Sequence, residues 1–268
     1  MRFKSLASVC AALGATLVLG NAGQAGAVVI VNDNLISPFL HKVYNDVLDR
    51  NPDAAGEAVW AAALAGGLDT EALATDFLTS HEYEDDLISR EFITLLGRAP
   101  TTVDLVALQG EGQWQIEQTI FTSAEYMSLH PGADPYIGSL YQNILGRPAD
   151  PGGLAVWSVL YDQGQFAALV NGILTSTEAK TDLVTGYYET LLNRAPDPAG
   201  LNDFVTNGFG TPASVEADFI GSPEFLADSA TSAAPEPATW AMLLLGFFGL
   251  GAVLRTARRK HWDVASAA

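Results

Sequence analysis

The sequence predicts an all-α protein built from tandem helical repeats. A short motif occurs four times, and it consists of an aromatic residue, two apolar residues three and four positions later, and an arginine. The arginines are separated by 48, 49 and 47 residues, a register that chance does not keep over four copies. Apolar residues around each motif recur at helical spacing. Repeats of this length cannot bury their apolar faces alone and therefore stack on their neighbours.

About three short helices are expected in each copy, and the first carries the motif. Its aromatic residue follows an apolar residue four positions earlier, which defines one face of a helix. These pairs are Leu40 with Tyr44, Ile88 with Phe92, Ile137 with Tyr141, and Val184 with Tyr188. The recurring arginine is expected to close the helix, where a cation suits the helix dipole. These arginines are Arg50, Arg98, Arg147 and Arg194.

A turn with a recurring aspartate precedes the second helix. The aspartates are Asp53, Asp150 and Asp197, and proline follows two of them, as expected of an N-cap and a first helical residue. Ten residues after each arginine stands a bulky anchor, namely Trp60, Trp157 and Phe204, with Leu108 in the second copy. The second copy lacks the aspartate and glycine and has Thr101, Thr102 and Asp104 there instead. We expect a shortened second helix in that copy.

The third helix pairs apolar residues four apart and runs into a cap for the next helix. The pairs are Leu73 with Phe77, Ile116 with Ile120, Leu169 with Ile173, and Val215 with Phe219. A Ser or Thr cap with an acid in the first turn then starts a helix that leads into the next copy. The acids are Glu82, Glu125, Glu178 and Glu224. We expect them to form bidentate ion pairs with the recurring arginines.

The segment from His130 to Pro135 breaks any continuous helix between the second and third copies. The four copies are therefore expected to pack as two pairs. This gives one domain over 28–130 with repeats 1 and 2, and a second over 136–229 with repeats 3 and 4.

The repeat residues resemble a bacterial secreted domain of unknown function, numbered 4214. Its signature combines an aromatic residue, Leu-Leu-Gly-Arg, a Pro-Asp-x-x-Gly-Leu-x-x-Trp stretch and a Ser-x-Glu-Phe ending. Tyr141 through Glu178 matches best, and the four copies together span Leu40 to Phe225. The resemblance implies a fold and an extracellular setting, but no activity.

Residues 1–27 have the features of a secretory signal peptide. Arg2 and Lys4 supply the positive start, Leu6 to Leu19 the apolar run, and Ala25 to Ala27 a small-residue cleavage site. Cleavage by signal peptidase would leave a mature chain that begins near Val28.

At the other end, a linker with a Pro-Glu-Pro motif (230–237) precedes a predicted transmembrane helix with a basic tail (238–260). The apolar run from Ala238 to Leu254 is at the short limit for a bilayer span, and the basic residues after it are expected to stay cytoplasmic. Pro235, Glu236 and Pro237, the apolar run and the basic cluster together resemble the PEP-CTERM sorting signal of exopolysaccharide-producing bacteria with a Gram-negative envelope. That resemblance implies recognition by an exosortase, cleavage near the motif, and release or attachment at the cell surface.

The charge of the chain is concentrated between these two ends. The whole sequence has a formal charge of −18, and six of its thirteen cations lie in the terminal segments, so the region from Val28 to Ala234 is more acidic still. Such a field disfavours nucleic acid and anionic lipid headgroups as partners. The single Cys10 excludes a disulfide framework and a cysteine-based zinc site.

No catalytic motif and no cofactor site is recognisable in the sequence. Asp53, Asp150 and Asp197 are of the type that binds calcium, but each turn offers a single acid, so helix caps are favoured and only weak surface calcium is left open. Trp60, Trp114, Trp157 and Phe204 are expected in the core rather than stacked on sugars.

The expected function is therefore that of an exported, exosortase-sorted cell-surface or extracellular-matrix protein. Its repeats would act as a non-enzymatic structural or interaction module associated with exopolysaccharide, with exosortase, signal peptidase and the membrane as partners. The first alternative is a calcium-dependent adhesion or carbohydrate-binding module. A weaker one is a matrix hydrolase, which needs a cleft with two carboxylates of perturbed pKa.

Overall fold

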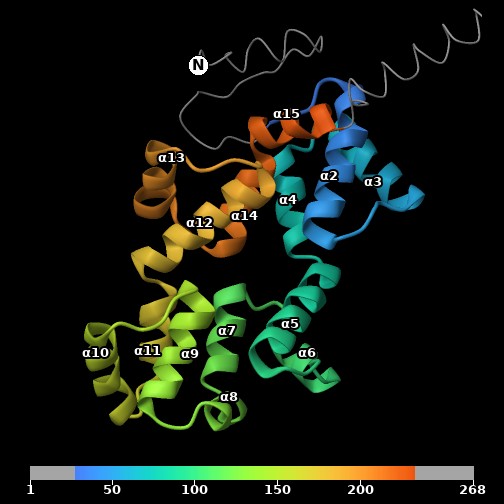
Figure 1. Cartoon of the computed structure of the whole chain (residues 1–268). Helices are drawn as coiled ribbons and strands as arrows, with labels where there is room; N and C mark the ends of the chain where they lie inside the picture. Colours follow the sequence, from blue (N-terminus) through green and yellow to red (C-terminus); the bar gives the residue numbers. More distant parts are fainter. Residues whose placement is uncertain (1–27, 233–268) are drawn as a thin grey trace, which may run out of the picture. The chain divides into compact units, whose positions relative to one another are not determined.

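The computed structural model describes residues 28–232, and within this range the protein is entirely helical (Figure 1). Fourteen α-helices, a 3-10 turn at Asp33–Leu35 and a π-helical turn at Asp203–Gly208 account for its regular structure, and no strand occurs among these residues. The predicted all-α fold class is confirmed. The predicted signal peptide, the Pro-Glu-Pro motif and the predicted transmembrane helix lie outside the described residues.

The helices follow the predicted repeats. The first helices of the four copies are α2 (Ile36–Leu48), α5 (His81–Leu96), α9 (Ala133–Leu145) and α12 (Thr177–Leu191). The second helices are α3 (Ala54–Ala65), α6 (Thr102–Leu108), α10 (Pro151–Asp162) and α13 (Pro198–Asn202), the last continued by the π-helical turn. The third helices are α4 (Thr70–Leu78), α7 (Gln113–Phe121), α11 (Phe166–Leu174) and α14 (Pro212–Gly221). Two further helices, α8 (Ala124–Leu129) and α15 (Pro223–Ser232), follow the third helices of the second and fourth copies.

A residue with left-handed backbone comes directly after α2, α5 and α9 and is the second residue after α12, and the recurring arginine follows it in all four copies. The left-handed residues are Asp49, Gly97, Gly146 and Asn193, with φ between 49° and 67°. Glycine and asparagine adopt this conformation at low cost, which explains the Leu-Gly-Arg and Leu-Asn-Arg sequences. The arginines thus lie just beyond the helix ends and not, as the sequence suggested, within the last turn.

The second helix of the second copy is short, as expected. The α6 helix has 7 residues, whereas α3 and α10 have 12 each. It begins at a capping box between Thr101 and Asp104 and ends where Gln109 turns extended before Gly110, whose φ is 82°. The helix thus stops before Gly110 and Gly112 after about two turns and lacks the third turn that the 12-residue helices have.

The predicted break between the second and third copies is present. The α8 helix ends at Leu129, and α9 begins at Ala133 after Gly132 with a φ of 97°. At the other two junctions α5 and α12 run without interruption from the Ser cap of one copy into the aromatic motif of the next. Within the described part of the chain, no helix is long and apolar enough to cross a membrane.

The repeats pack in pairs, but the partners are the first with the fourth and the second with the third. The α4 helix packs along α14, and α7 packs against α11, so the same type of helix mediates both contacts (Figure 1). The two contacts are equivalent: if copies 1 and 2 are exchanged with copies 3 and 4, the contact of α4 with α14 becomes the contact of α11 with α7. In addition, α7 contacts α14. Helix packing therefore crosses the boundary between 28–130 and 136–229, and all four copies form one compact unit that ends at Ser229.

The contact between α4 and α14 is close enough to need a glycine. A Cβ atom on Gly221 would lie 2.9 Å from the Cα atom of Glu71. The hydroxyl of the buried Thr70 donates to the carbonyl oxygen of Gly221 at 2.6 Å and accepts from the backbone N–H of Val28 at 3.1 Å. One side chain thus ties together the start of the described chain, the first repeat and the fourth.

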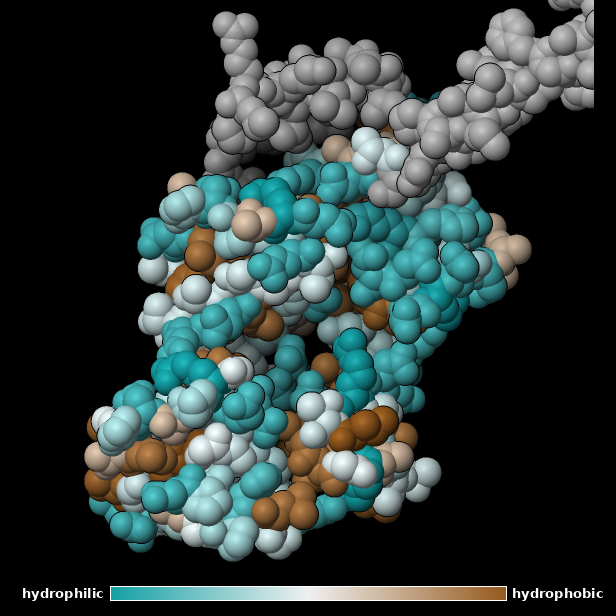
Figure 2. Space-filling model, viewed as in Figure 1, coloured by the Kyte–Doolittle hydropathy of each residue, from teal (hydrophilic) through white to brown (hydrophobic). Residues whose placement is uncertain are grey.

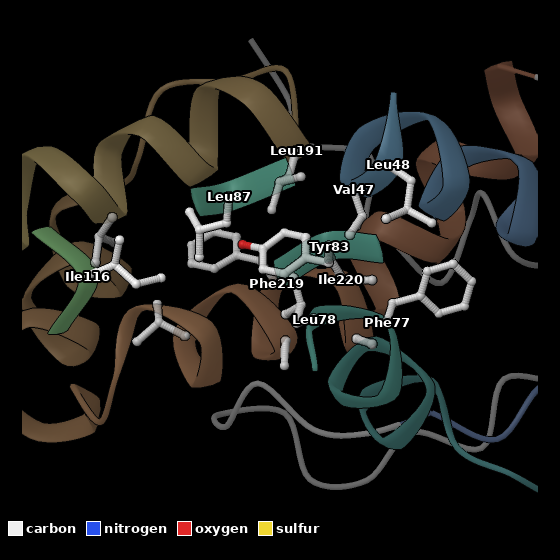
Figure 3. Packing of buried hydrophobic residues seen from close by; sticks show 14 of the residues in the cluster. Val47, Leu48, Phe77, Leu78, Tyr83, Leu87, Ile116, Leu191, Phe219 and Ile220 are labelled. Carbon is white, nitrogen blue, oxygen red and sulfur yellow. The ribbon is translucent and has the colours of Figure 1, made fainter. Parts of the chain in front are cut away.

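The apolar core is continuous through these contacts (Figure 3). Around Tyr83 it collects Leu87 from its own helix and Phe219 and Ile220 from α14, with Ile116 from α7 nearby. Because these side chains come from the second and the fourth copy, neither repeat buries its apolar face alone.

Candidate functional site

The structure brings each recurring arginine onto the recurring glutamate that follows the third helix of its copy. Arg147 donates from Nε to Glu178 Oε1 at 2.5 Å and from Nη2 to Oε2 at 2.8 Å. Arg98 does the same with Glu125 at 2.6 and 2.7 Å, and Arg194 with Glu224 at 2.5 and 2.9 Å. Arg50 uses the same two nitrogens on Glu82. We call these four bidentate pairs the clamps.

Each clamp also rests on the aromatic residue of the motif. The guanidinium carbon lies 4.9 Å from the ring centroid of Tyr44, 4.9 Å from Phe92, 5.1 Å from Tyr141 and 4.6 Å from Tyr188. This distance allows a cation–π interaction. Each clamp therefore joins the end of a first helix to the start of the helix that follows the third.

The recurring aspartates are helix N-caps. Asp150 accepts from the backbone N–H of Gly153, Asp197 from that of Gly200, and Asp53 from that of Gly56, each at 2.9 Å. These backbone hydrogen bonds lower the pKa of all three carboxyls. Each aspartate also lies 3.5 to 3.9 Å from an arginine nitrogen of its clamp.

In the second copy Thr101 is the N-cap, and Asp104 is the acid beside the arginine. Asp104 accepts from the backbone N–H of Thr101 at 2.8 Å and from Arg98 Nη1 at 3.0 Å. Among residues 28–232, no three His, Cys, Asp or Glu side chains are grouped so that they could hold a metal ion. The sorting residues Pro235, Glu236 and Pro237 lie outside the described residues.

A cavity of about 520 Å³ lies among α5, α7, α9 and α12, and the sequence did not indicate it. Aromatic and acidic side chains share its wall, with an amide and hydroxyls beside them. The wall includes Glu91, Glu117, Asp182, Trp114, Tyr187 and Asn143. We call this space the acidic cavity.

Burial perturbs the carboxyls of the acidic cavity. It raises the pKa of Glu117 to about 8, with a further contribution from the charge of Glu91, while a hydrogen bond from Gln113 Nε2 to Glu117 Oε1 at 2.7 Å opposes the shift. Burial also raises the pKa of Glu91 and of Asp182. A pKa of about 8 leaves Glu117 mostly protonated near neutral pH, which is unusual for a glutamate.

A second buried acid stands at the position equivalent to Glu117 in the fourth copy. Glu216 follows the buried Val215 just as Glu117 follows the buried Ile116. The hydroxyls of Tyr83 and Tyr187 donate to Glu216 Oε2 at 3.2 and 3.5 Å, and burial raises the pKa of this carboxyl. An acid directly after an apolar anchor was the available signal for both residues.

Comparison with known proteins gives one result that applies to the repeats. The model of the domain of unknown function DUF4214 matches residues 32–87 and 118–183. No curated protein and no solved structure shows significant similarity to the chain. The matched segments cover the first copy with its clamp, and the third copy with the helices on either side of it. The chain thus contains the domain of unknown function DUF4214, in two segments of its helical array.

Proposed function

We propose that this is an exported protein of the cell surface or extracellular matrix whose helical repeats act as a non-enzymatic structural or interaction module associated with exopolysaccharide. The observation that carries the proposal is the use of the recurring polar residues. In every copy the arginine, the glutamate and the capping acid bind one another or the backbone. Residues repeated in each copy thus hold the array together and leave its acidic surface free for contacts.

The export route in this proposal rests on the sequence of the two ends. The signal peptide over 1–27 would be removed by signal peptidase, and the PEP-CTERM-like ending at Pro235, Glu236 and Pro237 would be cut by an exosortase. The transmembrane helix over 238–260 would hold the chain in the inner membrane until then. The DUF4214 match is compatible with tandem repeats of about three helices each.

The test of the sorting step compares cells with and without exosortase. The mature protein is located in cell fractions, and both its termini are sequenced. We expect a start near Val28, and an end near Glu236 only when exosortase is present. Full-length protein in both strains would refute sorting, and sedimentation of the purified protein with isolated exopolysaccharide tests the module separately.

A carbohydrate-binding module is the second candidate, and the acidic cavity favours it. The ring of Trp114 lies parallel to that of Phe209 with centroids 5.1 Å apart and borders the cavity beside Asn143 and Glu117. Aromatic faces with carboxylates and amides suit sugar hydroxyls and rings. Titration of the purified protein with polysaccharide fragments, with and without calcium, separates the two versions of this candidate. Binding that Glu117→Gln abolishes supports the cavity, and binding that requires calcium supports the adhesion module.

The same cavity provides the test of the weaker hydrolase alternative. Glu117 keeps its proton near neutral pH, as a general acid must, and the charge of Glu91 acts on it, so the two carboxyls are the candidates for such a pair. Release of reducing ends from the matrix polysaccharide by the wild-type protein but not by Glu117→Gln would overturn the non-enzymatic proposal.

A further inference from the structure

Three of the four repeats place their own aromatic ring between their three helices. Trp60 packs against Phe77 of the third helix, with ring centroids 5.2 Å apart. Phe204 stacks on Phe219 at 4.8 Å, at the same place in the fourth copy.

In the third copy the ring is Trp157. Its Nε1 donates to the hydroxyl of Tyr141 at 3.1 Å. A Cβ atom on Gly172 would lie 2.6 Å from the indole, so a side chain at this position of the third helix would clash with the ring.

The second repeat lacks this ring and has a pocket in its place. Leu108 stands at the anchor position, and α6 ends there. A pocket of about 270 Å³ is bordered by Phe92, Leu108, Thr119 and Ile120. Ile120 matches Phe77 and Phe219 of the other copies, and Thr119 matches Gly172. The pocket therefore occupies the space that an aromatic ring fills in the sibling repeats.

The pocket has the chemistry of a site for an uncharged ring. Its floor is apolar, since Leu108 and Ile120 are buried and Phe92 replaces the tyrosine of the other copies. Of the four charged groups that border it, Arg98 is paired with Glu125 and with Asp104, and the fourth, Glu111, is exposed to solvent. An apolar cavity of about 150 Å³ is already large enough to bind benzene in an engineered protein.

The surface beside the pocket is also apolar. Val103 and Val106 on α6 are 74% and 75% exposed. Hydrophobic surface gathers over this part of the molecule in the space-filling view (Figure 2). A ring that enters the pocket would thus be attached to a ligand with further apolar surface to cover.

We infer that the second repeat carries a binding site for one external, uncharged aromatic ring of the size of an indole. The ring would occupy the position that Trp157 occupies in the third repeat and would fill the space between the three helices of the second. The proposed structural role does not use this pocket, and the binding of a ring there does not depend on the sorting step.

The test is a calorimetric titration of the purified full-length chain with indole. We expect saturable binding of one equivalent. Leu108→Trp and Leu108→Phe fill the pocket from within, so both should abolish binding and raise the melting temperature. Val156→Trp is the matched control, because it adds the same ring at an exposed position of α10, and it should leave indole binding unchanged.

The complementary variant opens the equivalent space in the third repeat. Trp157→Leu should bind a second equivalent of indole, and Phe204→Leu provides the same test in the fourth repeat if the first variant does not fold. Absence of saturable binding to the wild-type chain, or binding that Leu108→Trp leaves intact, would overturn the inference. Binding to Trp240→Ala but not to the wild type would overturn it too, because the pocket would then hold the ring of the chain's own C-terminal segment.

Discussion

A double-mutant cycle on Arg147 and Glu178 tests whether the clamps hold the repeats together. Arg147→Met keeps the length of the side chain and removes its charge, and Glu178→Gln keeps the shape of the carboxyl. The two side chains are 38% and 42% exposed, so solvent screens their attraction. Exposed ion pairs contribute about 0.2–1 kcal/mol, and a bidentate geometry lies at the upper end. We therefore expect a coupling energy of about 1 kcal/mol.

The single substitutions should cost more than the coupling alone. Arg147→Met also removes the cation–π contact with Tyr141, which is worth about 0.5–1 kcal/mol at an exposed site. Glu178→Gln also removes a negative charge from the first turn of α12, worth about 0.3–1 kcal/mol. These extra terms cancel in the cycle, so the coupling energy reports the pair itself.

The assay is urea unfolding of the four proteins followed by circular dichroism, at low salt and at about 1 M salt, where the coupling should shrink. Lys42 and Asp46 provide a control cycle, because they form a single contact at 2.7 Å within one helix and should couple by only about 0.3–0.5 kcal/mol. A coupling for Arg147 and Glu178 no larger than that of the control would refute the clamp as a stabilising element.

Three further predictions concern buried groups. Because Glu117 has a pKa of about 8 in the folded protein and about 4.5 when unfolded, the folded state binds more protons between these values, and stability should fall as pH rises through them. Glu117→Gln should flatten that fall between pH about 4.5 and about 8, by at most about 5 kcal/mol because Glu91 shares the effect; an unchanged pH profile of the urea midpoints would contradict the assignment. Gly153→Ala should destabilise the protein by about 1–3 kcal/mol, since its Cβ atom would lie 2.2 Å from the hydroxyl oxygen of Tyr141, whereas Gly138→Ala, with no heavy atom within 4 Å, should be neutral or stabilising in thermal unfolding. Thr70→Val should cost about 1–3 kcal/mol because it leaves the N–H of Val28 and the carbonyl of Gly221 without their buried partner; Thr75→Val, whose hydroxyl hydrogen bond is exposed, is the control and should cost less.

Local features of the helices could be predicted because they depend on neighbours in the chain. The caps at Asp150 and Asp197 follow from an acid before a proline, and the short α6 follows from Gly110 and Gly112. The pairing of Arg147 with Glu178 could be predicted because both recur with the period of the repeat. The placement of the arginines was less accurate, since the left-handed residue before each one ends the helix earlier.

The acidic cavity could not be predicted from the sequence. Glu91 and Glu117 lie on different helices, and although Glu117 follows an apolar anchor, nothing in the sequence indicates that the two carboxyls meet in one cavity. Their pKa values depend on how α5 and α7 pack against α9 and α12. The pocket of the second repeat is an intermediate case, because the leucine at the ring position was visible in the sequence, but the empty space beside it was not.

The sequence by itself determined that this protein is an array of four helical copies, each with the same arginine and glutamate and, in all but the second, the same capping aspartate. These features lie within one period of the repeat, so periodicity and capping chemistry are enough to specify them. Only the tertiary structure decided that the first copy packs on the fourth and the second on the third. That choice depends on contacts such as the hydrogen bond from Thr70 to Gly221, which joins residues 151 positions apart. Repeats with the same apolar faces can pair in several ways, and the break at 130–132 together with the close approach at Gly221 selects one of them.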